Sequence, residues 1–384
     1  MATATSRQPS RTDAAGRIRA LMPTVLSSVG AVAIALLVGA VFILISNDNP
    51  IDAYRALVEG AFGTRRAIGE SLVLSVPLIF TGLAFAIAFR AGMFNIGAEG
   101  QFVIGGLAAG LVGAIDSGMP LVVHLPLAIL AAVVAGGIWG AIPGALKAWS
   151  GAHEVITTIM LNYLAFRVLQ YSLNRGDEWL PVDPMLQATD RVQETAELRV
   201  ILDGTRLHAG FILAIVVAVA LWYVLFRTTF GYRIRTVGLS RGAAAYASIS
   251  WGATIILAMF VSGLMAGLGG ATETLGLQGR MYADPPGYGF AGIAVGLVGR
   301  NHPIGVVFAG LLFGVLRSGS TQMQNQVGTS KELVLVLQGL VILSVSAFAA
   351  IGRMQAWRSR RARPRETPGV PATVGVEPGQ PPAA

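Results

Sequence analysis

The chain has 384 residues, of which 54% are hydrophobic and 12% charged, and its mean hydropathy is +0.64. A soluble domain of average composition carries about 25% charged residues, so this composition excludes an ordinary soluble protein and indicates an all-α polytopic membrane protein. The formal charge of +8 lies in short loops and at the two ends, where topology signals are found; no basic, aromatic-interleaved patch is present to bind nucleic acid.

The first half of the chain is expected to contain five membrane spans. Residues 1–21 form a polar cytoplasmic tail, and the apolar run that follows is too long for a signal-peptide core, so it is interpreted as a retained first span. The mixed-charge stretch Asn47 to Glu70 is expected to be a loop. The five spans are predicted at Met22 to Ser46, Ser71 to Arg90, Gln101 to Ile115, Leu121 to Leu146 and Ile156 to Leu173.

The second half follows the longest polar insertion, Asn174 to His208, which holds seven acidic residues and four arginines. Its own basic loop, Arg227 to Ser250, has four arginines and no acid. Five crossings are predicted here as well: Phe211 to Phe226, Trp251 to Ala271, a short half-helix from Gly287, a further span after the polar turn Arg300 to Pro303, and Leu333 to Ile351. Residues 22–351 then form one transmembrane domain, and the basic, Pro/Gly-rich residues 352–384 a disordered cytoplasmic tail.

The charges indicate how about ten crossings are oriented. With both ends in the cytoplasm, the inner segments hold 17 Lys/Arg and the outer segments 10, while acidic residues divide five inside and fifteen outside. The opposite orientation would place the acid-free loop and both basic ends outside. The positive-inside rule therefore favours cytoplasmic termini.

A polar, glycine-punctuated break from Arg90 to Gln101 separates the second and third spans. Non-helical backbone at membrane depth is tolerated only where it packs against protein or lines a wet cavity, so this break is either part of a permeation site or a tight cytoplasmic turn. A second interruption occurs at Gly287 to Pro303. Five crossings per half predict inverted repeats, with the two interrupted elements facing each other near the midplane.

Glycines repeat at i, i+4 spacing along several spans, which predicts close helix packing in one bundle. The pairs are Gly136/Gly140, Gly140/Gly144, Gly106/Gly110, Gly263/Gly267, Gly292/Gly296 and Gly310/Gly314.

Motifs for catalysis are missing from the sequence. No phosphate-binding G-x-x-x-x-G-K-[ST] loop, G-x-S-x-G elbow or H-E-x-x-H pair occurs. The four histidines have no metal-ligand spacing, and without cysteine neither disulfides nor thiolate metal sites can form. We therefore expect no catalytic residue, no metal site and no cofactor in this chain.

Four stretches in order resemble bacterial ABC importer permeases of the branched-chain amino acid and ribose type. They are FRAGMFNIGAEGQ (89–101), GAHEVITTIMLNYLA (151–165), TVGLSRGAAAYASIS (236–250) and GFAGIAVGLVGRNHPIGVV (289–307). The motifs FNIGAEGQ and EVITTIMLN are similar to those of the nucleoside and simple-sugar branch of this family, the general nucleoside permeases. The resemblance covers about residues 22–351.

The resemblance implies a passive permease subunit with several partners. These are a second permease, identical or paralogous, a cytoplasmic ABC ATPase that binds ATP and Mg²⁺, and an extracytoplasmic substrate-binding lipoprotein. Ser240 to Ser250 would be the coupling helix seated in the ATPase; the alternative is that its arginines only enforce topology. The insertion Asn174 to His208 would receive the binding protein on the outer face, or would be a solvated loop without a partner. The residues predicted for ATPase coupling are Arg235, Gly238, Ser240, Arg241, Ala244, Ala245 and Ser248.

Polar residues in the spans are the candidates for the substrate pathway in the bacterial plasma membrane. Each either lines or braces the passage, or is an ordinary helix cap or interhelical hydrogen bond. A neutral nucleoside needs amide and hydroxyl partners more than charge; ribose, another simple sugar or a branched-chain amino acid is the alternative substrate. A stand-alone secondary transporter would need coupling residues such as Glu99, Glu154 or Glu273. The predicted pathway residues are Asn95, Glu99, Gln101, Thr157, Asn162 and Asn301.

Overall fold

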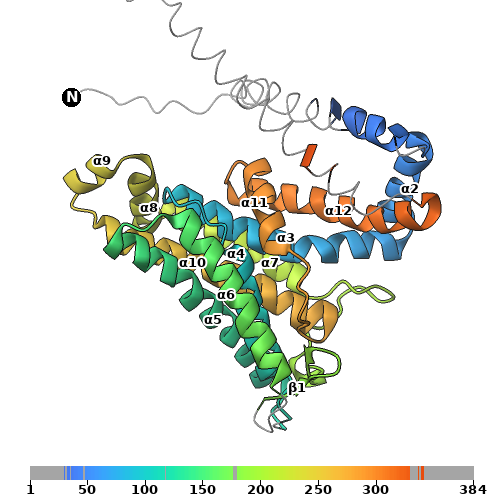
Figure 1. Ribbon diagram of the computed structural model, residues 1–384, viewed down its shortest axis with the longest axis horizontal. Coiled ribbons are helices and arrows are strands. Elements are labelled where there is room, and N and C mark those ends of the chain that lie inside the picture. Colours follow the sequence, from blue (N-terminus) through green and yellow to red (C-terminus); the bar gives the residue numbers. More distant parts are fainter. Residues whose placement is uncertain are drawn as a thin grey trace, which may run out of the picture.

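The computed structural model describes residues 36–45, 48–116, 118–175 and 180–328, with positions 30, 33–34, 336 and 339–340. Its regular structure is helical except for one antiparallel pair of two-residue strands (Figure 1). A helical stretch, Leu36–Ile45, precedes the labelled elements. These are α2 (Pro50–Phe62), α3 (Arg65–Arg90), α4 (Ala98–Gly113), α5 (Leu121–Ser150), α6 (Glu154–Asn174), β1 (Val182–Asp183), β2 (Ala188–Thr189), a 3₁₀ turn (Glu194–Ala196), α7 (Gly210–Arg227), α8 (Thr229–Leu239), α9 (Arg241–Tyr246), α10 (Trp251–Thr272) with a π-helical continuation (Glu273–Gln278), α11 (Tyr288–Val298) and α12 (Pro303–Val327).

The predicted multi-pass helical membrane protein is confirmed. In the described part, five helices are long and apolar enough to cross a bilayer, namely α3, α5, α7, α10 with its continuation, and α12. The helices α4 and α11 are apolar but shorter. Ten crossings remain a prediction, because the span Leu333 to Ile351, most of the span Met22 to Ser46 and both predicted tails lie outside the described residues.

Helix α3 forms the centre of the bundle. Nearly every residue from Val73 to Ala88 is buried, and its neighbours are α2, α7, α10, α11 and α12. Such a helix, apolar on all sides, is stable only inside a larger assembly of helices. The elements that pack on α3 are therefore held relative to one another by it.

Helices α5 and α10 pack through their glycines, as the spacing predicts. An added Cβ on Gly136 would lie 2.6 Å from the carbonyl oxygen of Gly263, and one on Gly267 would lie 2.4 Å from that of Ala132. Any side chain at these positions would push the two helices apart. The close approach therefore accounts for the small-residue rows.

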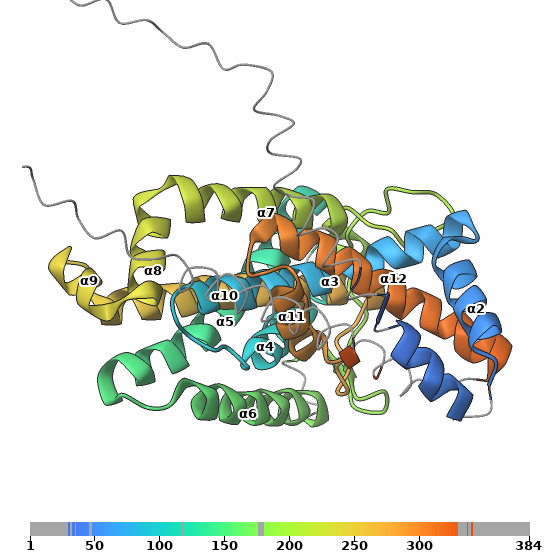
Figure 2. The ribbon, with the colours of Figure 1, turned by 90° about the horizontal axis from the view of Figure 1, so that it is seen from above.

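The two ends of the bundle hold different elements (Figure 2). The arginine-rich end holds the end of α3 at Arg90, the segment Arg227 to Ser250 with α8 and α9, and the turn between α11 and α12. The loop end holds α2 and the folded segment 180–208. Here Glu70 of α3 bonds Arg206, and Leu198 N–H bonds the Leu275 carbonyl.

A Schellman motif ends α3 and starts the break. Gly92 has φ +80°, Gly92 N–H donates to the Phe89 carbonyl, and Met93 N–H donates to the Ala88 carbonyl, both at 3.0 Å. Glycine accepts this left-handed conformation without a steric penalty. The chain then turns back into the bundle, and α4 begins at Ala98 beside α6, α10 and α11.

Two predictions about local structure are corrected. The stretch Asn47 to Glu70 is not a loop, because α2 and the first turn and a half of α3 lie in it; Asn49 caps α2 through a 3.0 Å bond to Ile51 N–H. The helix predicted from Ser240 to Ser250 is shorter, ending at Tyr246. Ser248 has φ +55°, which interrupts the helix before Ser250 caps α10.

Candidate functional site: a seam between two short helices

The N-termini of α4 and α11 meet inside the bundle, next to the middle of α3 and α10. The Glu99 carboxylate accepts hydrogen bonds from Gly289 N–H at 2.6 Å and Phe290 N–H at 3.2 Å. These are orphan donors of the first turn of α11, and the positive end of the helix dipole lies there. The side chain is 1% exposed, and its Oε1 has no hydrogen-bond partner in the described part. The two interrupted elements therefore lie side by side (Figure 2), while the inverted repeats stay a prediction.

Asn95 and Gln101 stabilise the break that leads into this seam. Asn95 Nδ2 donates to Gln101 Oε1 at 3.1 Å and lies 2.9 Å from the Ser262 hydroxyl oxygen. Ser262, near the middle of α10, itself donates to the Ala84 carbonyl of α3 at 2.7 Å. All three polar side chains are buried. The network ties the break to both α3 and α10.

Asn162 of α6 bonds the break from the other side. Its Nδ2 donates to the Ile96 carbonyl at 3.0 Å, and its Oδ1 accepts from Gly100 N–H at 2.8 Å. One amide thus satisfies a carbonyl before α4 and an orphan donor in its first turn.

The other two predicted pathway residues lie elsewhere. Thr157 bonds only carbonyls of its own helix, those of His153 and Glu154, and it is Thr158 whose side chain packs against Gly97. Asn301 belongs to the arginine-rich end. The predicted set thus divides into four residues at the seam, Asn95, Glu99, Gln101 and Asn162, and two away from it.

Sequence reasoning missed several seam residues. The Thr81 hydroxyl lies 2.9 Å from the carbonyl oxygen of Tyr288, the first residue of α11. The guanidinium of Arg317 on α12 lies 4.3 Å from the centre of the Tyr288 ring and donates to the Pro286 carbonyl. A lone polar residue in an apolar span, such as Ser262 or Arg317, was the available signal.

An aromatic ring between two arginines joins α7, α3 and α8 at the arginine-rich end. The guanidiniums of Arg90 and Arg235 lie 4.9 and 5.3 Å from the centre of the Phe226 ring, and His302 stacks on that ring at 5.2 Å. Burial, and then the charge of Arg90, lowers the pKa of His302 below its ordinary value, so the imidazole stays neutral. No carboxylate of the described residues pairs with these arginines, so cation–π contacts hold the cluster together.

The same cluster reaches the turn after α11. Arg90 Nε donates to the Asn301 carbonyl at 2.6 Å. Arg300 and Asn301 have φ of +55° and +52°, a conformation that is strained for residues other than glycine. The strained turn is therefore fixed by α3, and its position depends on the end of α3.

Gly238 sets the distance between α8 and α3. An added Cβ there would lie 2.0 Å from the Arg90 carbonyl oxygen and 3.0 Å from Gly92 N. The C-terminal turn of α8 is thus in backbone contact with the end of α3 and the start of the break.

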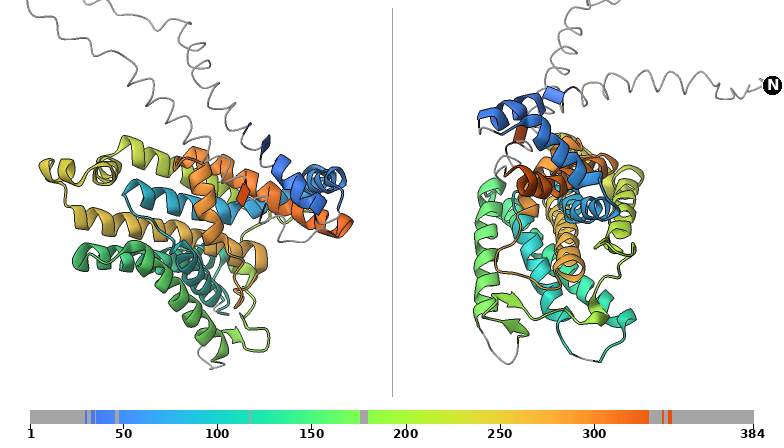
Figure 3. Two further views of the ribbon diagram at one scale, coloured as in Figure 1. Left: turned by 45° about the horizontal axis from the view of Figure 1, so that its top comes forward. Right: turned by 90° about the vertical axis from the view of Figure 1, so that its right-hand side faces the viewer.

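Helix α9 extends from this junction as an exposed structure (Figure 3). Ser240 caps it by accepting from Ala243 N–H at 3.2 Å, and the Arg241 guanidinium lies 3.7 Å from the centre of the Trp251 ring on α10. Ala244 is buried, whereas Ala245 and Ser248 are exposed. Leu239 is 88% and Tyr246 96% exposed. Two large apolar side chains are therefore exposed at this arginine-rich end.

Comparison with known proteins identifies the family. A family model described as the permease component of the branched-chain amino acid transport system matches residues 67–346. The guanosine ABC transporter permease protein NupP of Bacillus subtilis (strain 168) is 40% identical over 84% of this chain and 92% of its own length. No solved structure matches.

Two further relatives differ in the substrate that their names give. The nucleoside ABC transporter permease protein NupB of Lactococcus lactis subsp. cremoris is 36% identical, over 82% of this chain and 89% of its own. The glucose ABC transporter permease protein TsgB13 of Haloferax volcanii is also 36% identical, over 80% and 83%. These relatives are transport proteins and not enzymes. The chain belongs to the family of branched-chain amino acid transport system permease components, as a multi-pass ABC transporter permease.

Proposed function

We propose that this chain is the permease subunit of an ATP-driven importer of nucleosides. The substrate class rests on the 40% identity to the guanosine permease over most of both chains. In this proposal a second permease completes the channel, and a separate ATPase binds ATP and Mg²⁺. The arginine-rich end faces the cytoplasm, with both termini, because short basic loops are retained there.

The single observation that carries the mechanism is that the exposed α9 directly follows α8, which is in backbone contact with α3 at Gly238. Leu239 and Tyr246 offer an apolar surface to the ATPase, and Arg241 against Trp251 fixes the base of α9 on α10. When ATP binding closes the ATPase dimer, the pull enters through α9 and α8. The contact of Gly238 with the Arg90 carbonyl passes it to α3.

The pull then reaches the seam along two routes. One runs from Arg90 to the Asn301 carbonyl and so to the end of α11. The other runs through Gly92 into the break, where Asn95 is bonded. Both routes end where Glu99 holds the first turn of α11. Moving α4 relative to α11 opens the passage outward, and hydrolysis resets it inward.

The seam suits a neutral solute. Asn95, Gln101 and Asn162 offer amide groups, and Glu99 Oε1 is an acceptor without a partner in the described part. As these protein–protein bonds exchange for bonds to ribose hydroxyls and base edges, no net charge has to be buried. A simple sugar is the second candidate, favoured by the 36% identity to the glucose permease.

The loop end is proposed to receive the binding protein. Residues 180–208 are folded onto the bundle, because Thr189 N–H bonds the Met281 carbonyl and Val192 N–H the Gly279 carbonyl, both at 2.9 Å. The insertion Asn174 to His208 has a net charge of minus three, which would steer a basic rim. A preformed surface lowers the ordering cost of docking.

A stand-alone secondary transporter is the competing class. It needs an ionisable group that is free to bind a coupling ion. Glu154 pairs with Lys147 at 2.9 Å, whereas Glu99 Oε1 and Glu273 Oε2 have no hydrogen-bond partner within the described residues, so the partners and the energy source of uptake decide between the two classes. Co-purification in mild detergent tests the proposal: we expect an ABC ATPase and a binding lipoprotein that binds guanosine. Purification of the chain alone, fully active in uptake, would refute it.

A further inference from the structure

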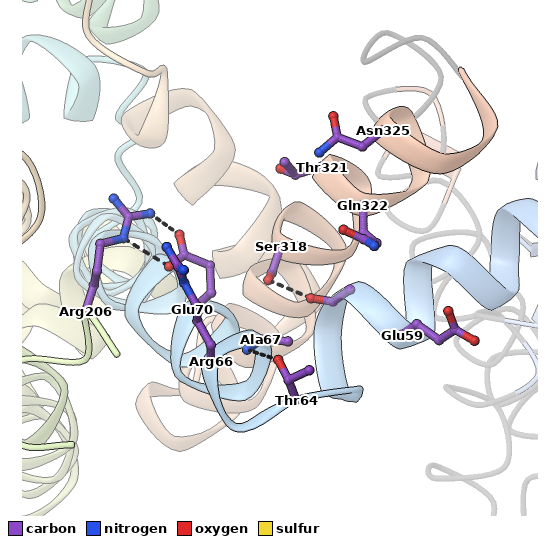
Figure 4. Close-up of a pocket in the computed structure, with 11 residues that line it drawn as sticks. Glu59, Thr64, Arg66, Ala67, Glu70, Arg206, Ser318, Thr321, Gln322 and Asn325 are labelled. Carbon is purple, nitrogen blue, oxygen red and sulfur yellow. Dashed lines mark hydrogen bonds and ion pairs between the residues drawn. The ribbon is translucent and has the colours of Figure 1, made fainter. Parts of the chain in front are cut away.

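A polar pocket of about 650 Å³ opens at the loop end, between α2, α3 and α12 and the segment before α7 (Figure 4). Ligand sites for small molecules have volumes of about 300–1,000 Å³, so the pocket is large enough for a nucleoside. It lies outside the seam and outside α9.

The charges in the pocket cancel. It is lined by two carboxylates, Glu59 and Glu70, and two guanidiniums, Arg66 and Arg206. Glu70 accepts from Arg206 Nε at 3.1 Å, and Glu59 pairs with Arg55 at 2.8 Å. Arg66 has no carboxylate partner within the described residues, but the formal charges of the four ionisable lining side chains sum to zero, so the pocket as a whole favours a neutral ligand.

One wall of the pocket is an uncharged polar stripe on α12. Ser318, Thr321, Gln322 and Asn325 follow the i, i+3, i+4, i+7 spacing of one helical face. The side chains of Thr321, Gln322 and Asn325 make no hydrogen bond within the described residues. A face of free amides and hydroxyls on an otherwise apolar span must face water or a ligand.

The pocket adjoins the seam. Ser318 lies in the pocket, and the preceding residue, Arg317, contacts the Tyr288 ring at the start of α11. Tyr288 precedes Gly289, which Glu99 holds. Arg317 thus connects the helix that lines the pocket to the helix whose movement opens the passage.

We infer that this pocket is an entry site where a neutral, polyhydroxylated solute rests before it reaches the seam. The amides and hydroxyls are hydrogen-bonding partners for sugar hydroxyls, whereas no aromatic residue is present among the described lining residues to stack on a base. The site therefore recognises the sugar part of the solute. This inference rests on the proposed function. It adds a site on the permease that the substrate contacts before it reaches the seam.

Cysteine protection tests the site cleanly because the chain has no cysteine of its own. Thr321→Cys and Asn325→Cys are each made in the full chain, in membrane vesicles without ATP, and labelled with an impermeant maleimide. We expect guanosine and ribose to slow labelling at both positions, and ribose 5-phosphate to have little effect. Gln326→Cys, on the same helix but outside the pocket, is the control: it labels at a rate that the solutes leave unchanged.

Removal of the amides gives an independent measure. Within Asn325→Cys as the reporter, Gln322→Leu should raise the ribose concentration for half-maximal protection by about tenfold, since one hydrogen bond is lost. Gln326→Leu in the same reporter should leave it unchanged. Absence of labelling, absence of protection, equal protection at position 326, or equal protection by ribose 5-phosphate would each overturn the inference.

These outcomes are distinct from failure of the proposed function. Protection is measured without ATP, so ATP-driven guanosine uptake with no protection would remove the entry site alone. Protection by ribose without any ATP-driven uptake would instead refute the importer and leave the site.

Discussion

Replacement of Gly238 by alanine tests whether α8 must touch α3. The added Cβ would lie 2.0 Å from the Arg90 carbonyl oxygen, and ordinary contact begins at 3.4 Å, so the two backbones must separate by about 1.4 Å. Overpacking of this kind costs about 1–3 kcal/mol of stability. Because a misplacement of about 1 Å far from the reacting centre can cost about 100-fold in rate, we expect uptake to fall at least tenfold.

The assay compares uptake and ATP hydrolysis in proteoliposomes that contain the co-purified complex. Gly238→Ala should keep ATP hydrolysis, since the ATPase is untouched, and lose uptake. Gly252→Ala is the matched control, because it lies outside α9 and its Cβ would meet only the Ala148 side chain at 3.3 Å. Uptake by Gly238→Ala at the wild-type rate, in a complex of normal composition, would refute the transmission through this contact.

Three other changes have defined outcomes. Glu99→Ala leaves the Gly289 N–H without its acceptor and should lower the free energy of unfolding by about 1–3 kcal/mol. Glu99→Gln keeps an acceptor oxygen and should lower it less. Equal melting temperatures for Glu99→Ala and the wild type would contradict the role of Glu99 at the seam. Burial lowers the pKa of His208 to about 4, below its unfolded value of about 6.5. The free energy of unfolding that depends on neutral His208 is therefore fully present above pH 6.5 and falls by about 3 kcal/mol as the pH approaches 4. His208→Gln should flatten this pH dependence in a series of melting curves, and an unchanged slope would contradict the buried neutral imidazole. Gly267→Ala would place a methyl group 2.4 Å from the Ala132 carbonyl oxygen and should lower the melting temperature of the detergent-solubilised protein; a melting temperature equal to wild type would contradict the close packing of α5 on α10.

Glycine and proline residues in the sequence were sufficient to predict the two helix interruptions. Gly92 ends α3 because the left-handed position needs glycine, and Pro303 starts α12 at its first residue. The polar residues between Arg90 and Gln101 had no plausible place in lipid, so their gathering around the break followed from burial alone. The glycine rows likewise predicted close helix packing, and the structure shows that α5 and α10 are a pair that uses it.

Register and distant pairing were beyond the sequence. The sequence predicted Thr157 as a pathway residue, but Thr158 is the threonine that faces the break. A helix without a strong apolar stripe does not reveal which of its faces is inward. Asn301 contributes its carbonyl to Arg90, an interaction that no side-chain pattern encodes. The pairing of Glu99 with Gly289 spans 190 residues of sequence. The helix α2 was wrongly predicted as a loop, although the sequence contains its signal. Asn49 is a helix cap, and Pro50 after it is the residue favoured at the first helical position.

The central claim is that energy comes from ATP through a partner ATPase. Uptake of radiolabelled guanosine by cells or vesicles that contain this chain and its partners, with the protonmotive force collapsed and ATP maintained, tests it most directly. Uptake should persist under these conditions and stop when ATP alone is depleted. Uptake that vanishes with the protonmotive force while ATP remains would contradict it.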